Sequence, residues 1–242
     1  MSGKDRDLQD EESAQPDGRG RDVATAVQEV VGALEEEIVL GILHPRERLV
    51  EDDLMSRFAV KRHVVRNALA ELETQGLVQR KRNSGAQVRA LTGKEVVELY
   101  ALREILETSC VKLIPFPVRP AELQKIVALQ RTHTAAVRKG DPRAVFRANL
   151  AFHAALHALS GNDALIEAIT EYARRTYPVR LSTLVAQESL ERARDEHLQI
   201  IEALREGDRD LLVKLYARHL RPSRDAYLAT LKRLGKLEEP AG

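Results

Sequence analysis

The sequence predicts a mainly α-helical protein made of two units: a small winged helix-turn-helix with a β-hairpin wing, then an all-α bundle of six antiparallel helices. Strand patterns are confined to residues 76–89, and apolar residues elsewhere repeat at helical spacing. Aromatic residues make up 4% and Trp is absent, a composition typical of packed helices. A chain of 242 residues is long enough for two separate cores. We therefore expect two domains, at residues 23–91 and 92–235.

Residues 1–22 contain almost no large apolar side chains, so we expect a disordered tail there, and a second, short tail at residues 236–242. The next stretch has the apolar spacing of a helix from Val23 to about Leu40, with Asp22 as its N-cap. Gly41 and Pro45 then end this helix.

Two short helices are expected on either side of residues 59–60. Leu54 and Phe58 lie four residues apart before this break, and the apolar positions after it also follow helical spacing: Val64, Val65, Ala68, Leu69 and Leu72. Residues 76–80 then have the pattern of a strand, 82–85 that of a turn, and 86–89 that of a returning strand. These are the parts of a winged helix-turn-helix.

Positive charge gathers on one side of this unit. Arg62, His63 and Arg66 fall opposite the apolar stripe of the second helix, since steps of three and four residues return to one face. From Arg57 to Arg89 there are eight basic and two acidic residues, about +6, whereas the whole chain carries +1. Such a cluster suits DNA, where Arg pairs with guanine in the major groove; an ordinary solvated helix face is the alternative. The acidic first helix and the acidic start of the second should face away from phosphate.

The rest of the chain is expected to form six helices separated by Pro, Gly and Asn breaks: residues 93–115, 119–139, 141–160, 162–187, 188–206 and 208–235. Pro178 should kink the fourth of these helices.

Histidines in the helical unit have the spacing of a shared site. Asn149 and His153 lie four residues apart on one helix face, and His197 and His219 lie eleven residues before and after Asp208. If the last two helices form an antiparallel hairpin, equal rise on both arms brings these two imidazoles to one level. Three imidazoles and an amide oxygen would suit a divalent transition metal such as zinc. Ordinary core or surface histidines are the alternative, and we treat His44 and His133 as surface residues.

Several protein classes are excluded. No apolar run is long enough for a membrane helix, and the charged N-terminal segment has no apolar stretch for secretion. Cys110 is the only cysteine and cannot form an intramolecular disulfide, so we expect a cytoplasmic protein. Phosphate-binding Gly-rich loops and nucleophile elbows are absent from the sequence, so we expect no enzymatic activity.

The N-terminal unit contains Gly41-Ile42-Leu43-His44-Pro45, Leu49-x-Glu51-x-x-Leu54, Val60-x-Arg62-x-x-Val65-Arg66-x-Ala68-Leu69-x-x-Leu72-x-x-x-Gly76-Leu77-Val78 and Gly85-x-x-Val88. It resembles the winged helix-turn-helix of the GntR family of bacterial regulators. The sequence departs from the family pattern at Ala59, where Gly is usual, at Lys61, where Ser or Thr is usual, and at Asp52, where members carry a basic residue. The resemblance implies double-stranded operator DNA as the partner, contacted by the recognition helix and the wing tip: Lys61, Arg62, His63, Arg66, Arg82 and Asn83.

The C-terminal unit contains Asn149-Leu150-Ala151-Phe152-His153, Ser160-Gly161-Asn162 and His197-x-x-Ile200-x-x-Ala203-Leu204-x-x-Gly207-Asp208, followed by His219. It resembles the FCD effector domain of the FadR-like branch of the GntR family. The expected number of helices, six rather than seven, is similar to that of the VanR-like subgroup. The resemblance implies a homodimer, a small carboxylic acid effector and a divalent metal, zinc first with nickel and manganese as alternatives. The implied metal ligands are Asn149, His153, His197 and His219.

Arg103 shares a helical stripe with Val96 and Cys110 and should be buried, where a guanidinium requires an anion. Glu107, four residues later, is one candidate partner. The resemblance makes an effector carboxylate the other, with Arg180 as a second effector-binding candidate. The sequence thus predicts a ligand-responsive transcriptional repressor, associated with the nucleoid when bound to DNA. The rival hypotheses are a metal sensor without an organic effector and a three-histidine metallohydrolase.

Overall fold

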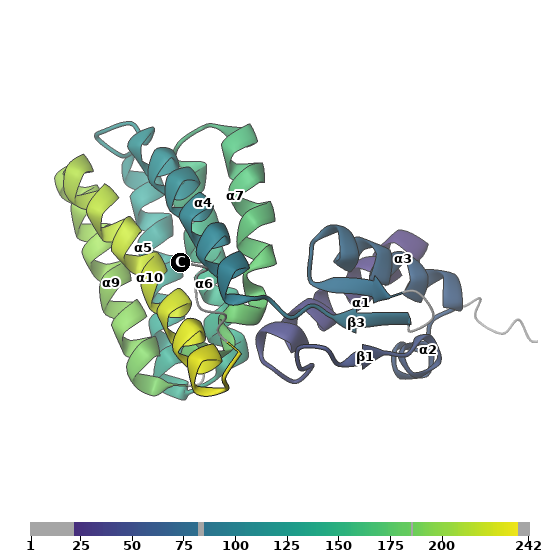
Figure 1. The fold of residues 1–242 in the computed structure, drawn as a ribbon. Coiled ribbons are helices and arrows are strands. Elements are labelled where there is room, and N and C mark those ends of the chain that lie inside the picture. Colours follow the sequence, from purple (N-terminus) through teal and green to yellow (C-terminus); the bar gives the residue numbers. More distant parts are fainter. Residues whose placement is uncertain (1–21, 82–84, 185, 237–242) are drawn as a thin grey trace, which may run out of the picture.

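A computed structural model describes residues 22–81, 85–184 and 186–236, which form two lobes joined by an extended segment (Figure 1). The N-terminal lobe contains α1 (Val23–Val39), β1 (Arg48–Leu49), α2 (Glu51–Phe58), α3 (Arg62–Thr74), β2 (Val78–Lys81) and β3 (Gly85–Val88). The C-terminal lobe contains α4 (Gly93–Lys112), α5 (Pro120–Lys139), α6 (Pro142–Ala158), α7 (Asp163–Arg175), the 3-10 helix η1 (Tyr177–Val179), α8 (Leu181–Leu184), α9 (Gln187–Glu206) and α10 (Arg209–Arg233). The predicted mainly α fold class is confirmed. Among the helices described, none combines the length and the hydropathy needed to cross a bilayer.

The turn between α2 and α3 depends on one residue with unusual backbone geometry. Ala59 ends α2 in the left-handed region, with φ 51° and ψ 45°, and its N–H donates to the carbonyl of Met55. The apolar stripe of α3 is buried, including Val65 and Leu72 at 0% exposure. The stripe therefore packs inward and leaves the basic side of α3 in solvent.

The three strands pair antiparallel in the order β1-β3-β2. Val78 pairs with Val88 in the hairpin, and Leu49 of β1 pairs with Ala86. The hairpin follows the predicted wing, whereas β1 was not predicted because two residues are too short to show alternation. The proposed wing-tip contacts, Arg82 and Asn83, lie outside the described residues, as do residues 1–21 of the expected tail.

Asp22 is the N-cap residue of α1, as expected, and its backbone carbonyl accepts from the N–H of Ala26, but its side chain makes no capping hydrogen bond. One expected helix is wrong. The expected single helix over 162–187 is interrupted: α7 ends at Arg175, and η1 and α8 follow before α9 begins. Pro178 lies in the first turn of η1, where its missing N–H costs no hydrogen bond.

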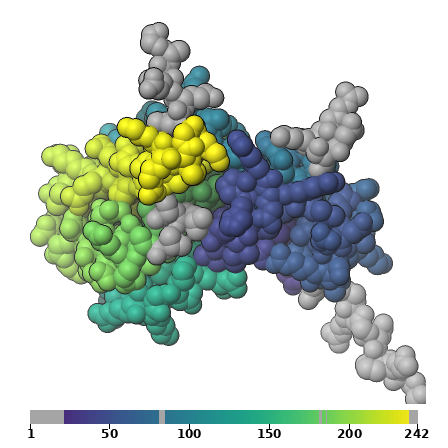
Figure 2. All heavy atoms as spheres, turned by 60° about the horizontal axis from the view of Figure 1, so that its bottom comes forward, coloured from purple at the N-terminus to yellow at the C-terminus, as the bar shows by residue number. Residues whose placement is uncertain are grey.

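The two lobes share one buried apolar cluster. Val31 and Leu34 of α1 belong to it together with Phe146 of α6 and Tyr177 of η1. The rings of Phe146 and Tyr177 meet edge to face, 5.2 Å apart. The space-filling view shows the purple and blue N-terminal lobe directly against the bundle (Figure 2). The position of the winged helix is therefore tied to η1 through α1.

Candidate functional site

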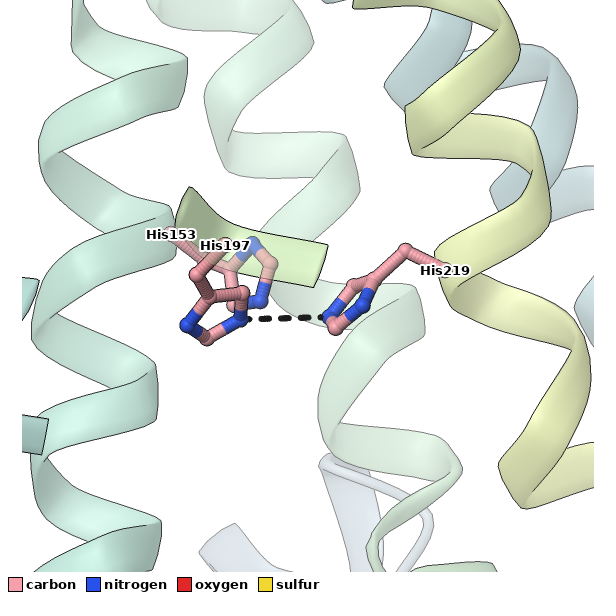
Figure 3. Close-up of side chains that lie close together, drawn as sticks. All are labelled: His153, His197 and His219. Carbon is pink, nitrogen blue, oxygen red and sulfur yellow. Dashed lines mark hydrogen bonds between the residues drawn. The ribbon is translucent and has the colours of Figure 1, made fainter. Parts of the chain in front are cut away.

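Three histidines converge in the C-terminal lobe. His153 lies on α6, His197 on α9 and His219 on α10, with their imidazoles gathered at one level (Figure 3). One nitrogen of each ring lies within 4.8 Å of the others, and Nε2 of His197 is 3.3 Å from Nε2 of His219. The hairpin between α9 and α10 turns at Gly207, which has a positive φ of 74° that favours glycine. The structure thus brings together the three imidazoles that the spacing predicted to be neighbours.

The three rings are each held at Nδ1 by a polar partner: Gln130 Oε1 for His197 (2.9 Å), Glu196 Oε2 for His219 (2.6 Å) and Tyr216 Oη for His153 (2.8 Å). These bonds leave Nε2 of each ring available as a ligand. In tetrahedral geometry, two nitrogens at about 2.0–2.1 Å from zinc lie roughly 3.3 Å apart. This matches the separation of His197 and His219, so the donors and their outer partners fit a divalent transition metal.

Burial keeps two of these imidazoles neutral. Desolvation, reinforced by the neighbouring histidines, lowers the pKa of His153 and of His197 well below the ordinary value of 6.5. Neutral imidazole is the form that binds a metal ion, so these side chains do not need to release a proton first.

A cavity of about 260 Å³ lies beside the histidines and is lined by His153 and His219, among others. Asn149, one helical turn before His153, also lines it and is 9% exposed. Within the described part of the chain, the Asn149 amide has no hydrogen-bond partner. Asn149 therefore lies on the wall of the same cavity as His153 and His219.

Arg103 and Arg180 both line this cavity, but their surroundings differ. Arg103 is 3% exposed and donates from Nε to Oε1 of Glu107 (2.9 Å) and from Nη1 to Oγ1 of Thr176 (2.9 Å). Glu107 is therefore the anionic partner of Arg103, which was one of the two partners predicted from the sequence. The guanidinium of Arg180 has no hydrogen bond or ion pair with any described residue. Burial, reinforced by nearby Arg103, lowers the pKa of Arg180.

The expectation that His133 is a surface residue is wrong. His133 is 1% exposed, and burial lowers its pKa to about 4. The signal for its burial was present in the sequence, because Ile126, Gln130 and Val137 lie with it on one face of α5. The same buried face carries Gln130, whose side chain pairs with His197.

The exposed side of α3, at its N-terminal end, carries the predicted basic cluster: Lys61, Arg62, His63 and Arg66. Arg62 donates from Nη2 to Asp52 Oδ1 (2.6 Å), and Arg66 donates from Nε to Glu51 Oε2 (3.0 Å). The acidic start of α2, which we expected to face away from phosphate, therefore lies beside the basic cluster. The tight turn at Ala59 brings the start of α2 beside the first turns of α3.

Comparison with known proteins gives matches for both lobes. Residues 26–88 match the family described as "Bacterial regulatory proteins, gntR family", and residues 98–222 match the FCD domain. The Nta operon transcriptional regulator of Aminobacter aminovorans is 25% identical over 190 residues, covering 78% of this chain and 88% of that protein. The gluconate operon transcriptional repressor of Bacillus subtilis (strain 168) is 32% identical over 97 residues, covering 39% of this chain and 40% of that protein.

Solved structures share the fold. E. coli McbR/YncC superposes with a TM-score of 0.75 at 20% identity, covering 85% of this chain and 98% of that one. A GntR regulator from Rhodococcus sp. RHA1 superposes with a TM-score of 0.69 at 24% identity, covering 84% and 97%. The FCD match alone spans more than half of the chain, and the matched proteins are transcriptional regulators, which excludes the metallohydrolase alternative. The chain therefore belongs to the GntR family of bacterial regulatory proteins and carries an FCD domain after its winged helix-turn-helix.

Proposed function

We propose that this protein is a transcriptional repressor that binds operator DNA as a homodimer and responds to a small carboxylate bound beside a divalent metal. Zinc suits the three imidazoles best, with nickel and manganese as alternatives. The observation that carries the proposal is Arg180, a half-buried cation that lines the same cavity as the histidines without an anion among the described residues.

DNA binding rests on the exposed basic end of α3. The side chains of Arg62 and Arg66 are 47% and 59% exposed, so their ion pairs with Asp52 and Glu51 are solvent-screened. Exposed pairs of this kind contribute only about 0–1 kcal/mol, and guanine edges or phosphates can replace them. In a two-fold homodimer, two copies of α3 would read the two half-sites of a palindromic operator.

Metal binding rests on the geometry of the three histidines and on their Nδ1 partners. Asn149 is the candidate fourth ligand, because its amide lines the cavity one turn from His153 and has no competing partner in the described structure. A neutral amide brings less negative charge than a carboxylate would. An anionic effector would therefore complement both the cation and Arg180.

The effector class follows from Arg180. A guanidinium that is partly removed from water and has no anion is unfavourable, and a carboxylate can satisfy it with two parallel hydrogen bonds. The cavity, at about 260 Å³, is smaller than the roughly 300–1,000 Å³ of sites for drug-sized ligands. A small organic acid fits these requirements.

The test is operator binding by the full chain, measured by fluorescence anisotropy on duplexes from the upstream region of its own gene. Zinc and a panel of small acids are added separately and together. One relative is named for the gluconate operon, so gluconate is a rational first acid. We expect an acid in the presence of zinc to change the operator affinity. A full response to zinc alone would favour the metal-sensing alternative, and no response to any addition would contradict the proposal.

A further inference from the structure

A buried chain of polar contacts begins at the histidine cluster. The hydroxyl of Tyr216 on α10 lies 2.8 Å from Nδ1 of His153 and 2.6 Å from Nε2 of His157. Tyr216 is 0% exposed and His157 is 6% exposed. A tyrosine hydroxyl has one proton, so it can donate to only one of the two imidazoles and must accept from the other.

The contacts continue from His157 toward η1. Nε2 of His157 lies 3.8 Å from Oε2 of Glu107, and the other oxygen of Glu107 accepts from Nε of Arg103. Arg103 in turn donates to the hydroxyl of Thr176, the residue that precedes η1. The Thr176 hydroxyl donates to the carbonyl of Ala173, so it holds Arg103 and the end of α7 together.

At its far end the chain of contacts reaches the element that positions the DNA-binding lobe. Tyr177 follows Thr176 directly, is 4% exposed, and packs in the cluster shared with α1. η1 contacts α1, and Phe146 packs against the Tyr177 ring. A shift of Thr176 would therefore change how α1, and with it α3, sits on the bundle.

We propose that Tyr216 and His157 are positioning residues. They couple occupancy of the three-histidine site by a cation to the position of α1 against η1, and the coupling passes through Glu107, Arg103 and Thr176. This inference rests on the proposed function, because it requires the histidines to hold a cation. It adds the path by which occupancy is transmitted to the winged helix.

The physical basis is the direction of the hydrogen bonds. When Nε2 of His153 binds a cation, its Nδ1 must carry the proton and donate to Tyr216. The Tyr216 hydroxyl then donates to Nε2 of His157, which has no proton to direct at Glu107. Without a cation, His153 can accept from Tyr216, and His157 can carry its proton on Nε2, facing both Tyr216 and Glu107.

Occupancy therefore changes which donors face the carboxylate of Glu107. When His157 offers no N–H, Arg103 is the remaining donor to Glu107 in this network, and buried polar contacts are strong enough for such a change to matter. Arg103 also donates a hydrogen bond to Thr176. A change in the hydrogen bond between Arg103 and Glu107 therefore shifts Thr176 and the start of η1.

Three variants of the full chain test this path. Tyr216→Phe removes the hydroxyl that joins His153 to His157. Thr176→Val removes the hydroxyl at the other end while leaving the histidines untouched. Tyr227→Phe is the matched control, because Tyr227 also lies on α10 and its hydroxyl donates to the carbonyl of Leu91, outside the path.

Two quantities are measured for each variant: zinc affinity by chelator competition, and the ratio of operator affinities with saturating zinc and with chelator. We expect a wild-type ratio that differs from one by a factor of about 5 or more, a response to zinc that the acid then enlarges. Tyr216→Phe should weaken zinc binding by about 10-fold or more, as for loss of an outer-shell partner, and bring the ratio to about one even at saturating zinc. Thr176→Val should leave zinc affinity unchanged and also bring the ratio to about one.

Tyr227→Phe should change neither quantity. The coupling would be overturned if Tyr216→Phe and Thr176→Val, each saturated with zinc, both gave the same ratio of operator affinities as the wild type. That result would leave the proposed function intact. If Tyr216→Phe fails to fold by circular dichroism, the ratio of Thr176→Val decides alone. Absence of zinc binding by the wild-type chain would overturn the proposed metal site and this coupling together.

Discussion

His197 and His219 face each other across the α9–α10 hairpin with their Nε2 atoms 3.3 Å apart. Both lie eleven residues from Asp208, the N-cap of α10, whose side chain accepts from the N–H of Leu211. Their Nδ1 atoms are fixed by different partners, an amide oxygen and a carboxylate. The pair is therefore held in place before any ligand arrives, and His153 completes the cluster from α6.

His219→Ala should strip zinc from the protein. It removes one of three imidazole ligands, so the loss of affinity should exceed the roughly 10- to 100-fold typical of an outer-shell partner. Elemental analysis after dialysis, with chelator competition, measures the effect. His44→Ala is the control, because His44 is exposed in the N-terminal lobe. A His219→Ala protein that retains one zinc per chain would contradict the assignment.

Arg180→Gln should abolish the response to the carboxylate while leaving zinc affinity unchanged. Since Arg180 has no ionic partner in the described structure, its loss should not lower the free energy of unfolding. Arg103→Gln provides the contrast, because it leaves Glu107 without its partner and should destabilise the fold by about 3–5 kcal/mol. Urea unfolding and anisotropy titrations measure the two effects. A normal acid response in Arg180→Gln would remove this residue from the effector site.

Asp52→Asn should strengthen DNA binding. Asp52 accepts from Arg62 at 2.6 Å and lies beside the proposed DNA-binding surface, so its removal should free the guanidinium and reduce repulsion of phosphate. An exposed pair contributes about 0.2–1 kcal/mol, so operator affinity should rise by roughly 1.4- to 5-fold. Asp53→Asn is the matched control, because it removes the same charge from an exposed neighbouring position. Equal effects of the two substitutions would show that only net charge matters.

Ala59→Gly should stabilise the protein. Ala59 has φ 51°, a conformation that costs an L-residue about 1–2 kcal/mol, and glycine adopts it without strain. The greater freedom of glycine in the unfolded chain offsets about 0.4–1 kcal/mol, which leaves a net gain of about 0.5–1 kcal/mol. Urea unfolding measures it. Ala70→Gly, on the exposed side of α3, should instead destabilise by about 0.5–1 kcal/mol; a loss of similar size at Ala59 would contradict the strain argument.

The winged helix and the histidine cluster could be predicted because both depend on local periodicity. Steps of three and four residues placed Arg62 and Arg66 on one face of α3, and equal distances from Asp208 placed His197 level with His219. A regular helix carries these relationships along the chain without reference to its neighbours.

Features set by tertiary packing could not be predicted in the same way. A proline such as Pro178 can kink a helix or begin a new one, and packing of Tyr177 against Phe146 and α1 accompanies the second outcome here. The partners Gln130 and Tyr216 depend on how α5 and α10 dock around the histidines. The approach of Asp52 to Arg62 depends on the angle of one turn.

The central claim is tested most directly by the operator affinity of the full chain with and without zinc plus a small acid. The measurement compares a duplex from its own upstream region with a scrambled duplex of equal length, at salt that suppresses loose phosphate binding. We predict a preference for the upstream duplex that zinc and the acid together weaken, by about 5-fold or more. Equal affinity for both duplexes, unchanged by either addition, would contradict the account.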